Sequence, residues 1–124
     1  MPTIHAYITA GPSAQQKKAL LTAASQAVVD SLGAPLRSVR LMLHDVARED
    51  IMVGGEAGRD SVVFHVHMIV GRDEAQKQAM FTALTQAAGS TLGVDGENVR
   101  VIVQDVPNTD MGMANGVSAK NTGR

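Results

Sequence analysis

Apolar residues recur along the chain with two different periods, and each period occurs in both halves. Runs of β-branched and apolar residues, with the alternation typical of a strand, occupy Thr3–Thr9, Val39–Val46, Val62–Val70 and Asn98–Val106. Apolar residues at helical spacing occupy Ala14–Leu32 and Asp73–Leu92. Each half of the chain therefore predicts a strand, a helix and a second strand.

Residues typical of helix ends flank both predicted helices. Gly11-Pro12-Ser13 predicts a turn before the first helix, with Ser13 as its N-cap. Gly33 and Gly93 follow the last apolar residue of each helical segment, where glycine is the usual C-cap. These residues support the predicted bounds of both helices.

The two halves are copies of one unit. Residues 2–60 align with residues 62–120 without a gap and are identical at 16 positions. Identity at one fixed offset over this length indicates an internal repeat. The identical pairs are His5/His65, Gly11/Gly71, Gln16/Gln76, Lys17/Lys77, Ala19/Ala79, Thr22/Thr82, Ala23/Ala83, Gln26/Gln86, Ala27/Ala87, Leu32/Leu92, Gly33/Gly93, Val39/Val99, Arg40/Arg100, Asp45/Asp105, Val46/Val106 and Asp50/Asp110. We interpret the chain as a fused duplication.

A strand–helix–strand unit implies parallel strands joined by a right-handed crossover. Two such units predict an α/β (α+β) fold, a four-stranded sheet with two helices on one face, in a single domain spanning residues 1–124. The strands Val39–Val46 and Val62–Val70 are largely apolar on both faces, which is typical of strands buried on both sides. Since two helices cover only one face, we expect a homo-oligomer in which sheets pack against each other.

Composition excludes several classes of function. A net charge of -1 and a pI of about 6.4 give no electrostatic footprint for nucleic acid or anionic membrane. The chain has no cysteine, so disulfides, thiol nucleophiles and thiolate metal sites are excluded. No apolar run reaches the length of a membrane span, and the N-terminus lacks the pattern of a signal peptide. We expect a cytoplasmic protein.

Pro2 is the strongest candidate for chemistry. Removal of Met1 would make it the N-terminal residue and expose a secondary amine. An α-amino group has a pKa of about 7.7–8.0, and burial beside cations would lower it because both disfavour the ammonium form. Such an amine would exchange protons readily near pH 7.

Other polar motifs are assigned structural roles. His65 and His67 share one strand face, but no third ligand is evident nearby, and we predict no metal site. His44 and Asp45 are adjacent on a strand, so they point to opposite faces and cannot form a dyad. Gly54-Gly55 and Gly112 are typical of turns, and the polar tail Ala114–Arg124 predicts a partly ordered flap or a frayed end.

Several of these residues carry a resemblance to the 4-oxalocrotonate tautomerase family. The matching residues in the first half are Pro2, Ala10-Gly11, Gln15-Gln16-Lys17, Ala34-Pro35-Leu36-Arg37-Ser38-Val39-Arg40 and Gly54-Gly55-Glu56; those in the second half are Val70-Gly71-Arg72, Gln76-Lys77, Val99-Arg100 and Met111-Gly112. The resemblance spans almost the whole chain. It implies a tautomerase-like fold and, for a fused duplicate, a homotrimer in which each chain replaces one dimer of a six-subunit assembly.

The resemblance also implies roles for individual residues. Pro2 would be the catalytic base, and the loop arginine, present as Arg72 but replaced by Pro12 in the first half, would bind the substrate's carboxylate. The strand arginine is present as both Arg40 and Arg100, and either could reach the Pro2 of a neighbouring chain. Ile51 and Met111 occupy the position of the apolar wall residue, which is often Phe in the family. Val62 stands where the second proline would be and, inside the chain, has no free amine, so only one site per chain is expected to work.

The implied activity is that of an enol–keto tautomerase acting on a small carboxylate such as 2-hydroxymuconate or phenylenolpyruvate, without a cofactor. Two alternatives keep Pro2 as a cation: decarboxylation of a 3-oxo acid, as in malonate semialdehyde decarboxylase, or hydration and dehalogenation. Hydration and dehalogenation are disfavoured, because the resemblance implies that dehalogenases of this superfamily have a carboxylate near the apolar wall that activates water. Neither Ile51-Met52-Val53 nor Met111-Gly112-Met113 contains an acidic residue. A third alternative is a non-catalytic trimer that has retained the fold and Met1.

Overall fold

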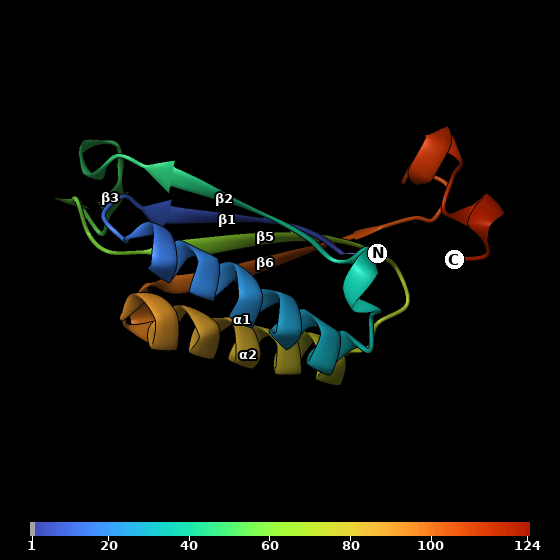
Figure 1. Ribbon diagram of the computed structural model, residues 1–124, viewed down its shortest axis with the longest axis horizontal. Coiled ribbons are helices and arrows are strands. Elements are labelled where there is room, and N and C mark those ends of the chain that lie inside the picture. Colours follow the sequence, from blue (N-terminus) through green and yellow to red (C-terminus); the bar gives the residue numbers. More distant parts are fainter. Residues whose placement is uncertain (1) are drawn as a thin grey trace.

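Two long helices cover one face of a four-stranded sheet in the computed structural model, which describes residues 2–124 (Figure 1). The first unit comprises β1 (Thr3–Thr9), α1 (Ala14–Leu32) and β2 (Arg40–Val46), and the second comprises β5 (Val62–Ile69), α2 (Glu74–Leu92) and β6 (Val99–Val106). A short hairpin of β3 (Met52–Val53) and β4 (Glu56–Ala57) joins the units. The predicted fold class is confirmed, with strand and helix bounds shifted by one residue at most.

Both helices begin with the same reciprocal arrangement of hydrogen bonds. Ser13 Oγ accepts from the Gln16 amide at 3.1 Å, and Gln16 Oε1 accepts from the Ser13 amide at 2.9 Å. Asp73 and Gln76 repeat this arrangement at α2, so Asp73 is the N-cap and not the first helical residue. These capping boxes satisfy amides that the first turn leaves without partners.

The strand order is β2-β1-β5-β6, and the centre of the sheet is antiparallel. Within each unit the strands pair in parallel, as the crossover rule predicts. Between the units, Thr3 pairs with His67 and Ile8 pairs with Val62. The start of β1 therefore lies beside the end of β5, and the start of β5 lies beside the end of β1.

The helices and the helix-facing side of the sheet form one hydrophobic core. Its buried members from both units are Ile4, Ala6, Ile8, Leu20, Ala24, Val28, Val62, Phe64, Val66, Met68, Met80, Leu84 and Ala88. On the same side, Lys17 pairs with Asp45, and Lys77 pairs with Asp105 at 2.8 Å. These two aspartates therefore pair with lysines of the helices and not with the strand arginines Arg40 and Arg100.

Residues 2–124 leave the opposite face of the sheet uncovered (Figure 1). Strand alternation places all four histidines of the chain there, and His5 Nδ1 and His44 Nε2 form a hydrogen bond of 2.7 Å. The Tyr7 ring stacks on His44 with 4.6 Å between ring centroids. Met42 and Ile102 on the outer strands are 42% and 54% exposed. A face with such apolar side chains fits the expectation that sheets of neighbouring copies pack together.

The segment after β6 is more ordered than a flap or frayed end. Gly112 forms a β-bridge with Ser118, and Ala119 is fully buried. Two 3₁₀ turns follow each other there, at Ala114–Gly116 and Lys120–Thr122.

The predicted turn at Gly54 and Gly55 is confirmed, because both residues have positive φ in the loop of the β3–β4 hairpin. No helix among residues 2–124 is long and apolar enough to cross a membrane.

We predict that Ile102→Glu abolishes self-association, because packing the open sheet face would bury an unpaired carboxylate, which costs several kcal/mol. Light scattering should give an oligomer for the native chain and a monomer for the variant. Ala19→Glu, which adds the same charge on the exposed side of α1, is the control and should leave the mass unchanged. An Ile102→Glu chain that keeps the native oligomeric mass would contradict the prediction.

Candidate functional site

Pro2 is buried at the point where β2 begins and β5 ends. Its carbonyl oxygen accepts a hydrogen bond of 3.0 Å from the Arg40 amide, and its side chain is fully buried. Continued by one residue, the pairing of β1 with β5 brings Pro2 next to Met68. Met1, on whose removal a free amine depends, lies outside the described residues. The surroundings of Pro2 are thus built by the second unit as well as the first.

A pocket of about 300 Å³ lies at this end of the sheet. Two arginines, Arg72 and Arg124, line it together with the mainly apolar residues Ala34, Pro35, Ser38, Ile69 and Val70. Ile69 is the last residue of β5, and Ser38 ends the 3₁₀ turn before β2, so the pocket adjoins the strands that flank Pro2. Arg72 lies in the loop after β5, at the same end of the sheet as Pro2.

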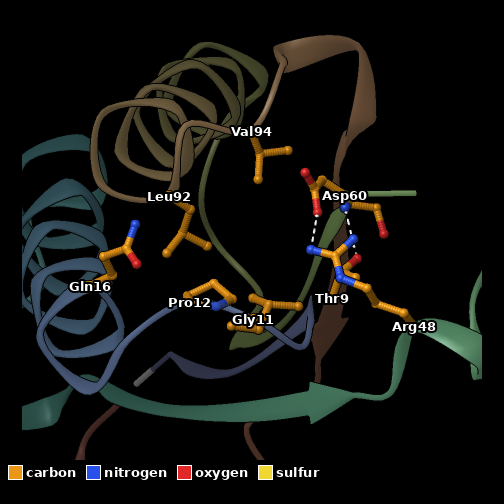
Figure 2. A pocket seen from close by; sticks show the side chains of 10 residues that line it. Thr9, Gly11, Pro12, Gln16, Arg48, Asp60, Leu92 and Val94 are labelled. Atoms are coloured by element: carbon orange, nitrogen blue, oxygen red, sulfur yellow. Dashed lines mark hydrogen bonds and ion pairs between the residues drawn. The ribbon is translucent and has the colours of Figure 1, made fainter. Parts of the chain in front are cut away.

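The other end of the sheet carries the repeat-related pocket, of about 230 Å³ (Figure 2). Pro12 stands there in place of Arg72, beside the end of β1 that pairs with Val62. Figure 2 shows the Arg48 side chain reaching toward Asp60. Arg48 donates to the Asp60 carboxylate at 2.7 Å and to the Gly58 carbonyl oxygen at 2.9 Å. This pocket has neither a proline amine nor an unpaired guanidinium.

The two strand arginines, Arg40 and Arg100, lie at opposite ends of the sheet. Arg40 begins β2 beside Pro2 and is exposed. Arg100 pairs in register with Val63 at the start of β5, and its guanidinium donates to the carbonyl oxygens of Glu97 and Val99 at 2.7 and 3.0 Å. Of the two strand arginines of one chain, Arg40 is the one at the Pro2 end.

The two predicted wall residues are separated in the same way. Ile51 follows the turn that carries Arg48, and its carbonyl oxygen accepts from Gly58 at 2.9 Å, so it belongs to the Val62 end. Met111 follows β6, and its carbonyl oxygen accepts from Ala119 at 2.8 Å. Met111 therefore lies in the tail that also carries Arg124.

Three residues near the pockets are absent from the sequence-based candidates: Arg48, Asp60 and Arg124. Comparison of the two repeats does not single out Arg48 and Asp60. The residue equivalent to Arg48 is the uncharged Asn108, and the residue equivalent to Asp60 is the oppositely charged Lys120. Arg124 falls beyond the repeat altogether. Across residues 2–124, no group of three or more His, Asp or Glu side chains is arranged to hold a metal ion.

Two family descriptions match the chain, and both are named tautomerase enzyme. One covers residues 2–60, which is the first unit, and the other covers residues 44–114, which includes most of the second. The chain is also 48% identical over 59 residues to a 2-hydroxymuconate tautomerase of Pseudomonas putida, a match that covers 48% of this chain and 92% of the relative. The relative thus corresponds to one of the two units.

Solved structures match both units together. A fused 4-OT described as a symmetric trimer is 46% identical, with a TM-score of 0.95 over 98% of this chain and 99% of that one. A malonate semialdehyde decarboxylase inhibited by 3-bromopropiolate is 27% identical, with a TM-score of 0.84 over 98% of this chain and 95% of that one. Tautomerases are isomerases, and the chain belongs to the tautomerase family as a fused protein with two 4-oxalocrotonate tautomerase-like units.

Proposed function

We propose that the chain catalyses the enol–keto tautomerisation of a small enol or dienol carboxylic acid such as 2-hydroxymuconate or phenylenolpyruvate. The observation that carries this proposal is the shared location of Pro2 and Arg72 at one end of the sheet, beside a pocket. At the other end both groups are replaced, by Val62 and Pro12. Loss of both groups at one end and retention of both at the other is expected if the two groups act together on one substrate.

The proposed mechanism needs one base and a cationic carboxylate site. With Met1 removed, the neutral Pro2 amine accepts the proton of the enol oxygen while the oxygen lone pair forms the carbonyl bond and the double bond shifts. The resulting ammonium returns its proton to carbon, so the amine is regenerated and no metal or organic cofactor is consumed. Burial of Pro2, with Arg72 and Arg124 at the same end of the sheet, would favour the neutral form of this amine.

The arginines would bind and polarise the substrate. A guanidinium presents a planar fork of donors that matches a carboxylate, and it stabilises negative charge that develops on oxygen. We assign the carboxylate to Arg72 and the carbonyl oxygen to Arg40 or Arg100, supplied by a neighbouring chain of a homotrimer. Met111 or Ile51 would provide the apolar wall that limits access of water to the amine.

The alternative of a 3-oxo acid decarboxylase has weaker support. Over 98% of the chain in each case, a fused 4-OT is 46% identical, whereas the malonate semialdehyde decarboxylase is 27% identical. Pro2 would be required in both reactions, so loss of Pro2 chemistry alone does not separate them. Ketonisation of an enol acid, followed by its ultraviolet absorbance, tests the tautomerase directly.

We expect an uncleavable N-terminal extension to lower kcat/KM for ketonisation about 100- to 10,000-fold, which is the usual contribution of a positioned base. The extension converts the Pro2 nitrogen into an amide without changing any side chain. Intact mass must show that Met1 is absent from the native chain and that the extension is present in the variant. An extended chain with native activity would exclude Pro2 as the base, and a native chain that retains Met1 would favour the non-catalytic trimer.

We expect Arg72→Ala to lower kcat/KM about 10- to 100-fold, because it removes a charge-assisted hydrogen bond to the carboxylate. Pro12→Ala at the repeat-related position is the matched control and should change kcat/KM less than about threefold, since that end lacks an amine. Steady-state kinetics of both variants make the comparison. Equal losses in the two variants would show that the ends of the sheet do not differ in the proposed way.

A further inference from the structure

Arg124 lines the pocket at the Pro2 end together with Arg72, although it lies outside both repeated units. The two arginines come from different segments, one from the loop after β5 and one from the end of the tail. Figure 1 shows the N and C labels at the same end of the sheet, consistent with a tail that returns to this pocket. Nothing in the repeat assigns a role to the tail residue.

Main-chain hydrogen bonds hold Arg124 at this position. Its amide donates to the Ala119 carbonyl oxygen at 3.0 Å, and its own main-chain oxygen accepts from Asn108 Nδ2 at 2.9 Å. Ala119 is fully buried, and Gly123, with a φ of 84°, supplies the left-handed turn that leads to Arg124. Because these contacts use the main chain, the guanidinium is not needed to hold the tail in place.

The pocket with the two arginines has no acidic side chain in its lining. Its lining contains no Asp or Glu, and within residues 2–124 no carboxylate forms an ion pair with Arg72 or Arg124. In the repeat-related pocket, Arg48 is already paired with Asp60. Two guanidinium groups without an acidic side chain therefore distinguish the Pro2 end, and they fit a ligand with one carboxylate for each guanidinium.

We propose that Arg124 is a second carboxylate-binding residue of the pocket at the Pro2 end of the sheet and makes the enzyme select enol acids with two carboxylates over those with one. This inference rests on the proposed tautomerase function. A dienol diacid carries carboxylates at both ends of its carbon chain, so one guanidinium cannot bind both. Arg72 would bind one carboxylate and Arg124 the other, each through its planar fork.

The test compares Arg124→Ala with the native full-length chain on two substrates, the diacid 2-hydroxymuconate and the monoacid phenylenolpyruvate. We expect kcat/KM for the diacid to fall about 10- to 100-fold, mainly through KM, because the lost contact is made in the ground state and the transition state alike. The value for the monoacid should change less than about threefold. Arg124→Lys, which keeps the charge but not the fork, should give an intermediate loss on the diacid alone.

Lys120→Ala is the matched control, since it removes a cation from the same tail at a residue that does not line the pocket. It should leave both substrates unaffected. Equal losses on the two substrates in Arg124→Ala, or no loss on the diacid, would overturn the proposal for Arg124. A native chain that ketonises neither substrate would instead refute the tautomerase function itself, so the two failures are distinguishable.

Discussion

The antiparallel pairing of β1 with β5 is the contact on which the rest of the arrangement depends. It joins two parallel strand–helix–strand units into one sheet and lets both helices share one core. It also sets the start of each unit beside the end of the first strand of the other. A group at the N-terminus of the chain therefore meets the loop that follows β5, and a residue of the second unit can serve a site whose base belongs to the first.

Because the unit is duplicated, the β1–β5 pairing has two equivalent ends, the Pro2 end and the Val62 end, and their residues differ. At the Val62 end, a main-chain amide replaces a terminal amine, Pro12 replaces the loop arginine, and Arg48 is neutralised by Asp60. At the Pro2 end, Arg72 and Arg124 line the pocket without an acidic partner among the described residues. A fused chain thus keeps the symmetric scaffold for folding, while the arginines that line a pocket without an acidic partner lie at the Pro2 end. A second site of the same kind at the other end would need a free amine at Val62. Val62 lies inside the chain, so its nitrogen is a peptide amide.

Local patterns predict most of the fold but only part of the candidate site. The bounds of α1 are those that its apolar spacing, Ser13 and Gly33 indicate, because helix signals are local in sequence. The opposite orientations of His44 and Asp45 follow from strand alternation in the same way. The β3–β4 hairpin is too short to show a period, and the position of Arg124 depends on a contact with Asn108 that no periodicity encodes. Asp45 and Asp105 pair with lysines of the helices and not with the strand arginines. These ion pairs depend on the packing of α1 and α2 on the sheet, which local sequence does not encode.

The most direct measurement exchanges the residues that distinguish the two ends. A double variant, Pro12→Arg with Arg72→Pro, keeps the number of arginines and moves the guanidinium from the Pro2 end to the Val62 end. Ketonisation of 2-hydroxymuconate should fall at least as far as in a chain that lacks Arg72, while light scattering reports the native oligomeric mass. Native activity in the exchanged chain would contradict the account, because it would show that the location of the arginine relative to Pro2 does not matter.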